Sequence, residues 1–197
     1  MKYIKEYNEY VDPFNEEDWD EVEIGSFLTL LKNHYPDKDT WKDIKEINCR
    51  NSNLTDLIGI DKLINLERLY CSHNQLKELD VTKNIKLEEL FCIYNQLTKL
   101  DISKNINLKY LYCSHNQLTE LDLSNNINLE DLFCKFNRLT ELDLSNNINL
   151  TNLYCYQNQL TKLDVTKNIN LTSLYCYGNQ LTELDVTKNI NLKEVSK

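Results

Sequence analysis

The sequence has 197 residues, enough for one domain or one domain with a small appendage, and 41% of them are hydrophobic, so it has the means to bury a core. Its formal charge of -9 is concentrated near the start: residues 1–43 carry 5 lysines against 12 acidic residues, and the remainder is nearly neutral. This distribution argues against binding to nucleic acid or to anionic membranes, because both require clustered Lys and Arg.

The sequence carries no recognisable targeting or membrane segment. No positive stretch followed by an apolar run opens it, and its longest apolar-rich run, Phe27 to Leu31, is too short to span a bilayer. We therefore expect no membrane insertion, and a cytoplasmic protein as given, or a surface or secreted one if the sequence is part of a longer chain. The seven cysteines are an odd number, which favours reduced thiols over disulfides.

Residues 1–43 are predicted to form an acidic, partly helical N-terminal cap. Asn15 is placed to cap a helix with an acidic first turn, Gly25 to interrupt it, and the sequence from Tyr35 to Asp37 to form a turn. The apolar residues available to cover the core that follows are Trp19, Val22, Phe27, Leu28, Leu30 and Leu31. The alternative function for this segment is that its acidic run docks a basic partner.

From residue 44 onward the sequence repeats. Leucines recur every 21 residues, at Leu66, Leu87, Leu108, Leu129, Leu150, Leu171 and Leu192, and the sequences between them are nearly identical. Strict self-similarity at such a period indicates a solenoid of stacked coils. We predict a solenoid over residues 44–197, with one imperfect coil at 44–65, six complete coils at 66–191 and a partial coil at 192–197.

Within a coil, the alternation of a short strand orients the repeated residues. Leu111 and Cys113 are expected to point inward and Tyr112 outward. The other residues assigned to the interior of this coil are Leu118, Leu121, Leu123 and Ile127. Strands stacked in register predict a parallel sheet.

The pattern L-x-x-L-x-C-x-x-N-x-L resembles the leucine-rich-repeat signature with Cys in place of a Leu. The 21-residue form with Leu-Asp-Val/Leu-Ser/Thr-x-Asn is similar to bacterial internalin-type repeats, above all to cysteine-bearing repeats of the internalin J type, over residues 44–195. The resemblance implies an α/β leucine-rich-repeat solenoid, with short parallel strands forming a concave sheet and a mostly irregular convex side. Members of that family are typically bacterial surface proteins that bind host molecules.

Two repeated columns resemble chemical sites but have structural explanations. The cysteines at 49, 71, 92, 113, 134, 155 and 176 occupy an inward position, where Cys behaves as a small hydrophobe. Zinc is the alternative, but one thiol per coil gives a line of sulfurs about 4.8 Å apart instead of a tetrahedron. The asparagines at 74, 95, 116, 137, 158 and 179 are predicted to satisfy backbone groups at the turn, as the family's asparagine ladder does.

Two polar columns raise the possibility of calcium. The aspartates stand at 80, 101, 122, 143, 164 and 185, and the asparagines at 84, 105, 126, 147, 168 and 189. A calcium-binding β-roll needs Gly-rich loops, and the chain has three Gly. Asx and Ser/Thr hydrogen bonds within the turn explain the same residues, so we predict no metal and no cofactor.

The outward strand positions are the predicted binding surface, because they form one continuous face. The first outward position is always aromatic, at Tyr70, Phe91, Tyr112, Phe133, Tyr154 and Tyr175, which predicts an exposed stripe. Binding of a partner and stacking of the rings between coils both explain this stripe.

Further along each strand the residues differ between coils. Tyr154, Tyr156, Tyr175 and Tyr177 form a predicted two-by-two block, and Lys135, Phe136 and Arg138 a basic-aromatic patch beside it, with Tyr94 nearby. His73 and His115 lie two coils apart, about 10 Å, too far to share a metal ion. No catalytic constellation is recognisable, so we predict that the protein is not an enzyme.

These features favour a module that binds an as yet unidentified protein partner through the aromatic face. Glycan recognition by the same aromatics is one alternative, and a structural or assembly role through the solenoid ends is another. End-to-end self-association is predicted, if it occurs, to involve Leu171 to Lys197, where Leu192 and Val195 begin another coil.

Overall fold

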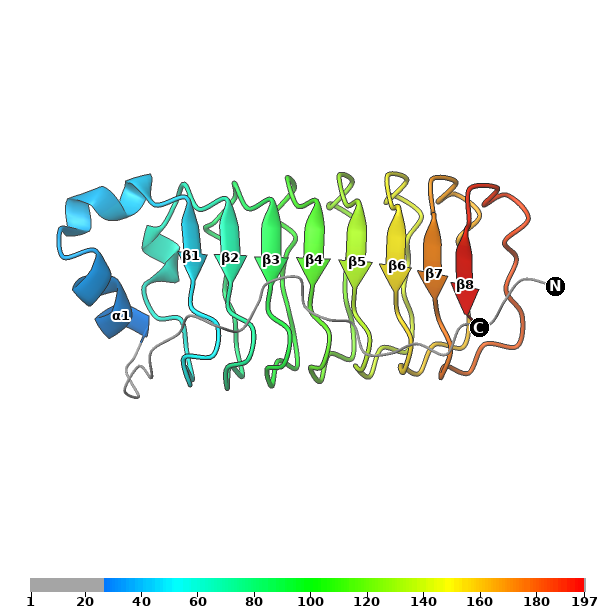
Figure 1. Ribbon diagram of the computed structural model, residues 1–197, viewed down its shortest axis with the longest axis horizontal. Helices are drawn as coiled ribbons and strands as arrows, with labels where there is room; N and C mark the ends of the chain where they lie inside the picture. The colour runs from blue at the N-terminus through cyan, green and yellow to red at the C-terminus, as the bar shows by residue number, and fades with distance from the viewer. Residues whose placement is uncertain (1–26, 197) are drawn as a thin grey trace.

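The computed structural model describes residues 27–196, and eight short parallel strands, joined by long irregular connections, form its only sheet in this part of the chain. They form one sheet in chain order, so each strand pairs only with its neighbours in sequence, as Figure 1 shows. The strands are β1 (Glu46–Asn48), β2 (Arg68–Tyr70), β3 (Glu89–Phe91), β4 (Tyr110–Tyr112), β5 (Asp131–Phe133), β6 (Asn152–Tyr154), β7 (Ser173–Tyr175) and β8 (Glu194–Ser196).

The register of the sheet follows the sequence repeat. From β2 to β8, each strand pairs with the residue 21 positions away, so Leu90 lies beside Leu111 and Leu111 beside Leu132. The β1 strand pairs at an offset of 22 residues, with Ile47 beside Leu69. Identical residue types therefore stack on one another along the sheet, and the predicted parallel-strand solenoid is confirmed.

Short helices lie beside the first strand, at the β1 end of the sheet (Figure 1). They are α1 (Phe27–His34) and the 3-10 helices η1 (Lys38–Asp43) and η2 (Ile60–Lys62). Phe27 and Leu31 are completely buried in the core of the solenoid, and Trp41 donates its indole N–H to the Tyr35 carbonyl at 2.7 Å. The predictions for Asn15, Trp19, Val22 and Gly25 lie outside the described residues.

Gly59 permits the close approach of α1 to the first coil. Its φ of +103° lies in a region that L side chains rarely adopt, and a Cβ there would come within 3.3 Å of the Leu28 side chain. The first coil has Ile58-Gly59-Ile60 where later coils have sequences such as Leu-Asp-Val or Leu-Asp-Leu, and this difference is explained by the backbone conformation and by the helix that packs on it.

The interior of each coil is built mainly from leucines. In the coil that begins at Leu108, the inward residues Leu111 and Cys113 and the later Leu118, Leu121 and Leu123 are all buried, as predicted. Burying such a set is stabilising only when a neighbouring coil covers it, so the hydrophobic free energy of the fold comes mainly from stacking.

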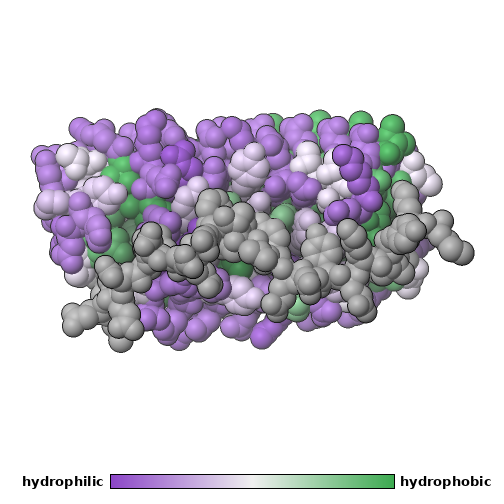
Figure 2. All heavy atoms as spheres, in the orientation of Figure 1, coloured by the Kyte–Doolittle hydropathy of each residue, from purple (hydrophilic) through white to green (hydrophobic). Residues whose placement is uncertain are grey.

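One assignment to the interior is wrong. Ile127 is 53% exposed. It belongs to a row of exposed isoleucines on the connections just before the strands, namely Ile64, Ile85, Ile106, Ile127, Ile148, Ile169 and Ile190. In Figure 2 apolar colour gathers along the upper edge of the molecule, over the connections that enter the later strands. The preceding residue, Asn126, is the one that turns inward and is completely buried.

The exposure of this row predicts the outcome of two substitutions. Ile127→Thr should change the free energy of unfolding by less than about 0.5 kcal/mol, because about half of the Ile127 side chain is exposed and the substitution removes little buried apolar surface. Leu129→Ala, two residues away and completely buried, should cost about 2–5 kcal/mol, since it opens a cavity in a packed interior. Urea denaturation of both variants measures the difference. Equal losses would place Ile127 back in the core.

The predicted asparagine ladder is present at the end of the strands. Asn116 accepts a hydrogen bond from the Leu97 backbone N–H at 3.0 Å, and its amide donates to the carbonyls of Cys92 and Cys113 at 3.0 and 3.1 Å. The side chain therefore joins its own coil to the one before it. The same pattern recurs at the other positions of the column.

A second ladder occupies the column that sequence analysis assigned to local turns. The Asn126 amide donates to the Ile102 and Asn105 carbonyls of the preceding coil at 3.1 and 2.9 Å. Asn84, Asn105, Asn147, Asn168 and Asn189 bind their preceding coils in the same way. These bonds satisfy backbone carbonyls inside the solenoid, which explains why Asn and not Ile is buried here.

The last coil is less well covered than the others. Leu181, Leu184, Val186 and Leu192 are only partly buried against the core, and Val195 is exposed on β8. End-to-end association through Leu171 to Lys197 stays a prediction. Within residues 27–196, none of the helices has the length and apolarity that a membrane crossing requires.

Candidate binding face

The outward side of the sheet, here called the sheet face, carries two rows of aromatic rings. The inner ring row comprises the last residue of each strand from β2 to β7, namely Tyr70, Phe91, Tyr112, Phe133, Tyr154 and Tyr175. Neighbouring ring centroids in this row lie 4.2–5.0 Å apart, and most pairs are stacked. The predicted stripe is therefore a continuous row of rings, stacked at three of its five contacts.

The inner ring row is much less exposed than expected. Tyr70, Phe91, Phe133 and Tyr175 are each exposed by less than a tenth, and Tyr112 and Tyr154 are half-buried. The prediction of an exposed stripe was wrong in this respect. The strand alternation correctly placed the rings outward, but neighbouring rings of the row cover part of one another's surface.

A cation covers the N-terminal end of the inner ring row. The Arg50 guanidinium lies 4.8 Å from the ring centroid of Tyr70 and 5.6 Å from that of Phe91. Such contacts between a cation and a ring face are attractive because the π-face is negative.

The tyrosine hydroxyls of the inner ring row bind carboxylates of the neighbouring coil. Tyr70 donates to Glu89 at 2.6 Å, Tyr112 to Asp131 at 3.3 Å and Tyr175 to Glu194 at 2.7 Å. Burial, reinforced by the bond to Glu89, raises the pKa of Tyr70 well above its ordinary value, so this hydroxyl remains a donor. These carboxylates are functional candidates that sequence analysis did not single out.

The outer ring row runs beside the ends of the strands and comprises His73, Tyr94, His115, Phe136, Tyr156 and Tyr177. The first four rings are stacked at 4.0–4.6 Å, the edge of Phe136 meets Tyr156 at 5.4 Å, and Tyr156 stacks on Tyr177 at 4.4 Å. Tyr94 and Phe136 are 47% and 41% exposed. This row therefore presents more aromatic surface than the inner row.

The backbone at the outer ring row is unusual and explains its arrangement. His73, Tyr94, His115 and Phe136 all have φ values of 53–56°, in the left-handed region that non-glycine residues seldom occupy. In the next two coils Gln157 and Gly178 take this position, and the ring is supplied instead by Tyr156 and Tyr177. The row thus shifts sideways by one residue between Phe136 and Tyr156.

The predicted site residues are largely brought together. Tyr154 and Tyr175 stack at 4.7 Å, and with Tyr156 and Tyr177 they form the expected block. The Lys135 ammonium lies 5.2 Å from the Tyr156 ring centroid, which joins the basic-aromatic patch to that block. Arg138 is exposed after the ladder residue Asn137, at the border of the sheet face.

The two histidines are ring-row members. Tyr94 stands between His73 and His115, with ring centroids 4.6 and 4.0 Å away. Burial, and secondarily the charge of Lys135, lower the pKa of His115 to about 4, so this ring is neutral at physiological pH. Ser72 and Ser114, which precede the histidines, are buried, and Ser72 accepts a hydrogen bond from the Ile93 backbone N–H.

The seven cysteines line the interior as buried thiols that form no disulfides. Burial raises the pKa of Cys49 and Cys113 to about 12, and that of Cys71, Cys92, Cys134 and Cys155 well above the ordinary value. A thiol that stays protonated is a poor nucleophile and a poor metal ligand. No group of three His, Cys, Asp or Glu side chains within residues 27–196 is arranged to hold a metal ion.

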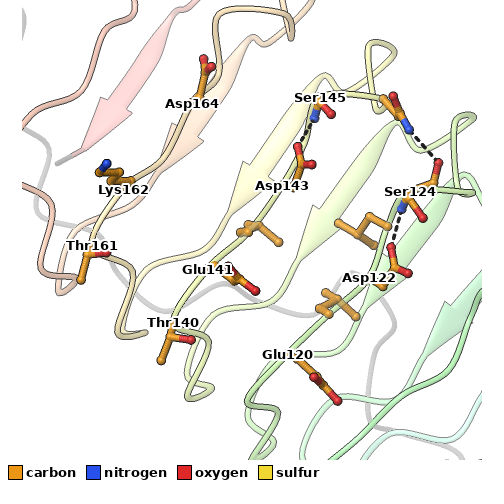
Figure 3. A pocket seen from close by; sticks show the side chains of 14 residues that line it. Glu120, Asp122, Ser124, Thr140, Glu141, Asp143, Ser145, Thr161, Lys162 and Asp164 are labelled. Carbon is orange, nitrogen blue, oxygen red and sulfur yellow. Dashed lines mark hydrogen bonds between the residues drawn. The ribbon is translucent and has the colours of Figure 1, made fainter.

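The aspartate column lies on the segments that follow the strands and lines a shallow depression, shown in Figure 3. Asp122 accepts the Ser124 backbone N–H at 2.9 Å and Asp143 that of Ser145 at 2.9 Å, as predicted for Asx turns. These hydrogen bonds lower the pKa of both carboxyls. The labelled acidic side chains in Figure 3 stand one beside another along the coils and do not converge on a single point.

Stacked coils with a 21-residue period, an inward Leu and Cys on each strand and an asparagine ladder define a leucine-rich-repeat solenoid. The chain therefore has the leucine-rich-repeat fold, and solenoids of this fold in general serve as protein-interaction modules.

Comparison with solved structures gives bacterial proteins of the same fold. A leucine-rich-repeat protein from Leptospira interrogans is 27% identical, with a TM-score of 0.75 over 81% of this chain and 44% of that chain. Internalin C2 from Listeria monocytogenes is 23% identical, with a TM-score of 0.65 over 81% of this chain and 83% of that chain, which shows the fold alone.

The functional domain of InlJ from Listeria monocytogenes, described as including a cysteine ladder, is 31% identical over 80% of this chain and 49% of that chain, with a TM-score of 0.42. The chain thus spans about half the length of the InlJ and Leptospira chains, at 49% and 44%. Neither a protein-family model nor a curated protein sequence matches it.

Proposed function

We propose that the chain is a protein-binding module and that its partner contacts the outer ring row and the adjoining tyrosine block. The observation that supports this best is the exposure of Tyr94 and Phe136, two large aromatic side chains held at backbone positions with positive φ. Aromatic side chains that stay accessible on a rigid scaffold are typical of the residues that dominate binding energy in protein interfaces.

The rigidity of the sheet face also favours binding. Each ring of the outer row is fixed by its neighbours, so little side-chain entropy remains to be lost when a partner binds. The inner ring row contributes less contact area because its rings are mostly buried, and we assign it the role of supporting the face.

A ring variant and a matched control test the proposal. The ring variant carries Tyr94→Ser, Phe136→Ser, Tyr156→Ser and Tyr177→Ser. The control carries Ile106→Ser, Ile127→Ser, Ile148→Ser and Ile169→Ser, four exposed apolar side chains on the edge of the sheet. Circular dichroism and thermal melting verify that both variants fold.

Proteins captured from the native organism by immobilised wild-type chain are then quantified for the three forms. We expect a partner that the wild type and the edge control retain and the ring variant loses, with binding weakened about a hundredfold, as for loss of interface hot spots. Equal capture by the ring variant would refute this site. Binding to a glycan array in place of a protein would refute the partner class.

A further inference from the structure

We infer that the partner bound by the sheet face presents a basic, arginine- or lysine-rich segment. This inference rests on the proposed function and adds the chemistry of the partner. It is carried by a row of carboxylates that runs alongside the inner ring row, at the first position of the strands and at the residue just before them.

Three of these carboxylates lie close together over β3 to β5. Glu89 opens β3 and Asp131 opens β5, and the sheet register places Tyr110 of β4 between them. Glu130 precedes Asp131 and accepts the Tyr110 hydroxyl at 3.1 Å. All four side chains are half-buried, so they remain accessible from solvent. We call these four residues the acid–tyrosine patch.

The carboxylates of this patch receive neutral donors. Glu89 accepts the Tyr70 hydroxyl, and Asp131 accepts the Tyr112 hydroxyl as well as the Thr151 hydroxyl and the Asn152 amide. Three other acids of the row are paired with cations of the chain itself: Glu46 with Arg68 at 2.7 Å, Glu67 with Lys45 at 2.9 Å and Glu88 with Lys109 at 2.8 Å. Glu194, which opens β8, accepts the Tyr175 hydroxyl as the patch carboxylates accept theirs.

The difference leaves negative charge concentrated on one part of the sheet face. Within residues 27–196, no Lys, Arg or His side chain lies within ion-pair distance of Glu89, Glu130 or Asp131. Hydroxyl and amide donors hold these carboxylates in position, and Arg68 and Lys109 attract Glu89 and Glu130 only from beyond ion-pair distance. A partner that places cations here therefore meets an oriented group of negative charges, which favours association electrostatically.

The ring rows beside the patch are already in contact with cations. Arg50 lies over Tyr70 and Phe91, and Lys135 lies over Tyr156. These two contacts are independent of the patch, and they show that the rings of this face accept guanidinium and ammonium groups. A basic segment lying along the coils would place its charges on the carboxylates and the stems of its side chains against the rings.

The position of the patch distinguishes this surface from the acidic depression after the strands. Asp122 and Asp143 in that depression also accept neutral donors, the backbone N–H groups of Ser124 and Ser145. No aromatic ring lines the depression. Removal of charge from the depression therefore serves as a control for the overall negative charge of the chain. Three carboxylates can be neutralised in the patch and three in the depression, so the two variants change the net charge equally.

The experiment uses a fluorescein-labelled octa-arginine peptide as the probe and an octa-citrulline peptide as its neutral counterpart, measured by fluorescence anisotropy. The patch variant carries Glu89→Gln, Glu130→Gln and Asp131→Asn. The control variant carries Glu120→Gln, Glu141→Gln and Asp143→Asn, which line the depression. Both raise the net charge by the same amount and keep side-chain acceptors.

We expect octa-arginine to bind the wild type and octa-citrulline not to bind it. The patch variant should weaken octa-arginine binding by at least about tenfold, and the control variant by less than about twofold, because the patch charges contact the ligand directly. Equal weakening by both variants would mean that octa-arginine responds only to the overall charge of the chain, and this result would overturn the inference. Absence of octa-arginine binding to the wild type would overturn it too.

The capture experiment separates this inference from the proposed function. If the ring variant loses its partner while the patch variant keeps it, the sheet face binds protein but not through a basic segment. If the ring variant keeps its partner, the proposed function fails, whatever octa-arginine does. Loss of the same partner by both variants, but not by the depression control, supports both.

Discussion

The folded chain should unfold steeply as the pH is raised above 9 under reducing conditions, because the buried thiols resist ionisation only while the protein is folded. All seven cysteines are buried, and none of them forms a disulfide. Burial raises the pKa of Cys49 and Cys113 from 9.0 to about 12. Below pH 9 the thiols are protonated in both states and the shift has no effect on stability.

Above pH 9 the unfolded chain ionises its thiols and the folded chain does not. Each thiol then lowers the folding equilibrium constant by roughly tenfold per pH unit, up to its folded pKa near 12. Six of the seven have pKa values that burial clearly raises, so their effects multiply. The pKa of Tyr70 is also raised, so tyrosine ionisation adds to the loss at higher pH.

Far-UV circular dichroism in a reducing buffer between pH 8 and 11 measures this transition, and urea denaturation at each pH gives the number of protons released on unfolding. Cys113→Ala is the informative variant. It loses packing at every pH, but the slope of stability against pH should fall by about one proton. Constant stability from pH 8 to 10.5 would mean that the thiols are accessible to solvent in the folded chain.

The repeat explains how much of the fold could be predicted. A 21-residue period with Leu111 and Cys113 two residues apart requires stacked strands with those side chains inside, and the sheet register agrees. Ile127 was predicted to be buried because it is apolar, and Asn126 was assigned to a local turn, but the structure exposes Ile127 and buries Asn126. The unbonded carbonyls of the preceding coil required a buried amide donor, and this requirement is not visible in one coil considered by itself.

The sheet face was predictable in position but not in exposure. Strand alternation places Tyr112 outward, but how much of its ring is covered depends on Phe91 and Phe133 in adjacent coils. The outer ring row depends on positive φ values at His115 and its equivalents, which residue preferences do not predict. Its sequence signal was the recurrence of aromatic or imidazole rings just before four of the six ladder asparagines.

The ladder that follows those rings should be the most sensitive polar feature of the solenoid. Replacing Asn116 by Ala removes the acceptor of the Leu97 N–H and one of the donors to Cys92 and Cys113. The two carbonyls keep a second donor, from Asn95 and Asn137 respectively. The Leu97 N–H is left buried without its partner, so we expect a loss of about 1–3 kcal/mol in the free energy of unfolding.

The matched control is Asn125→Ala, an exposed asparagine whose amide makes a longer bond of 3.3 Å to the Ser103 carbonyl. It should cost less than about 1 kcal/mol, because water replaces an exposed hydrogen bond. Urea denaturation compares the two variants, and similar losses would contradict the ladder's importance. Asn116 links two adjacent coils and stands directly after His115 of the outer ring row. Its loss should therefore loosen coil stacking beneath the proposed binding surface, which hydrogen exchange at the Leu97 amide would detect as faster exchange than in the control.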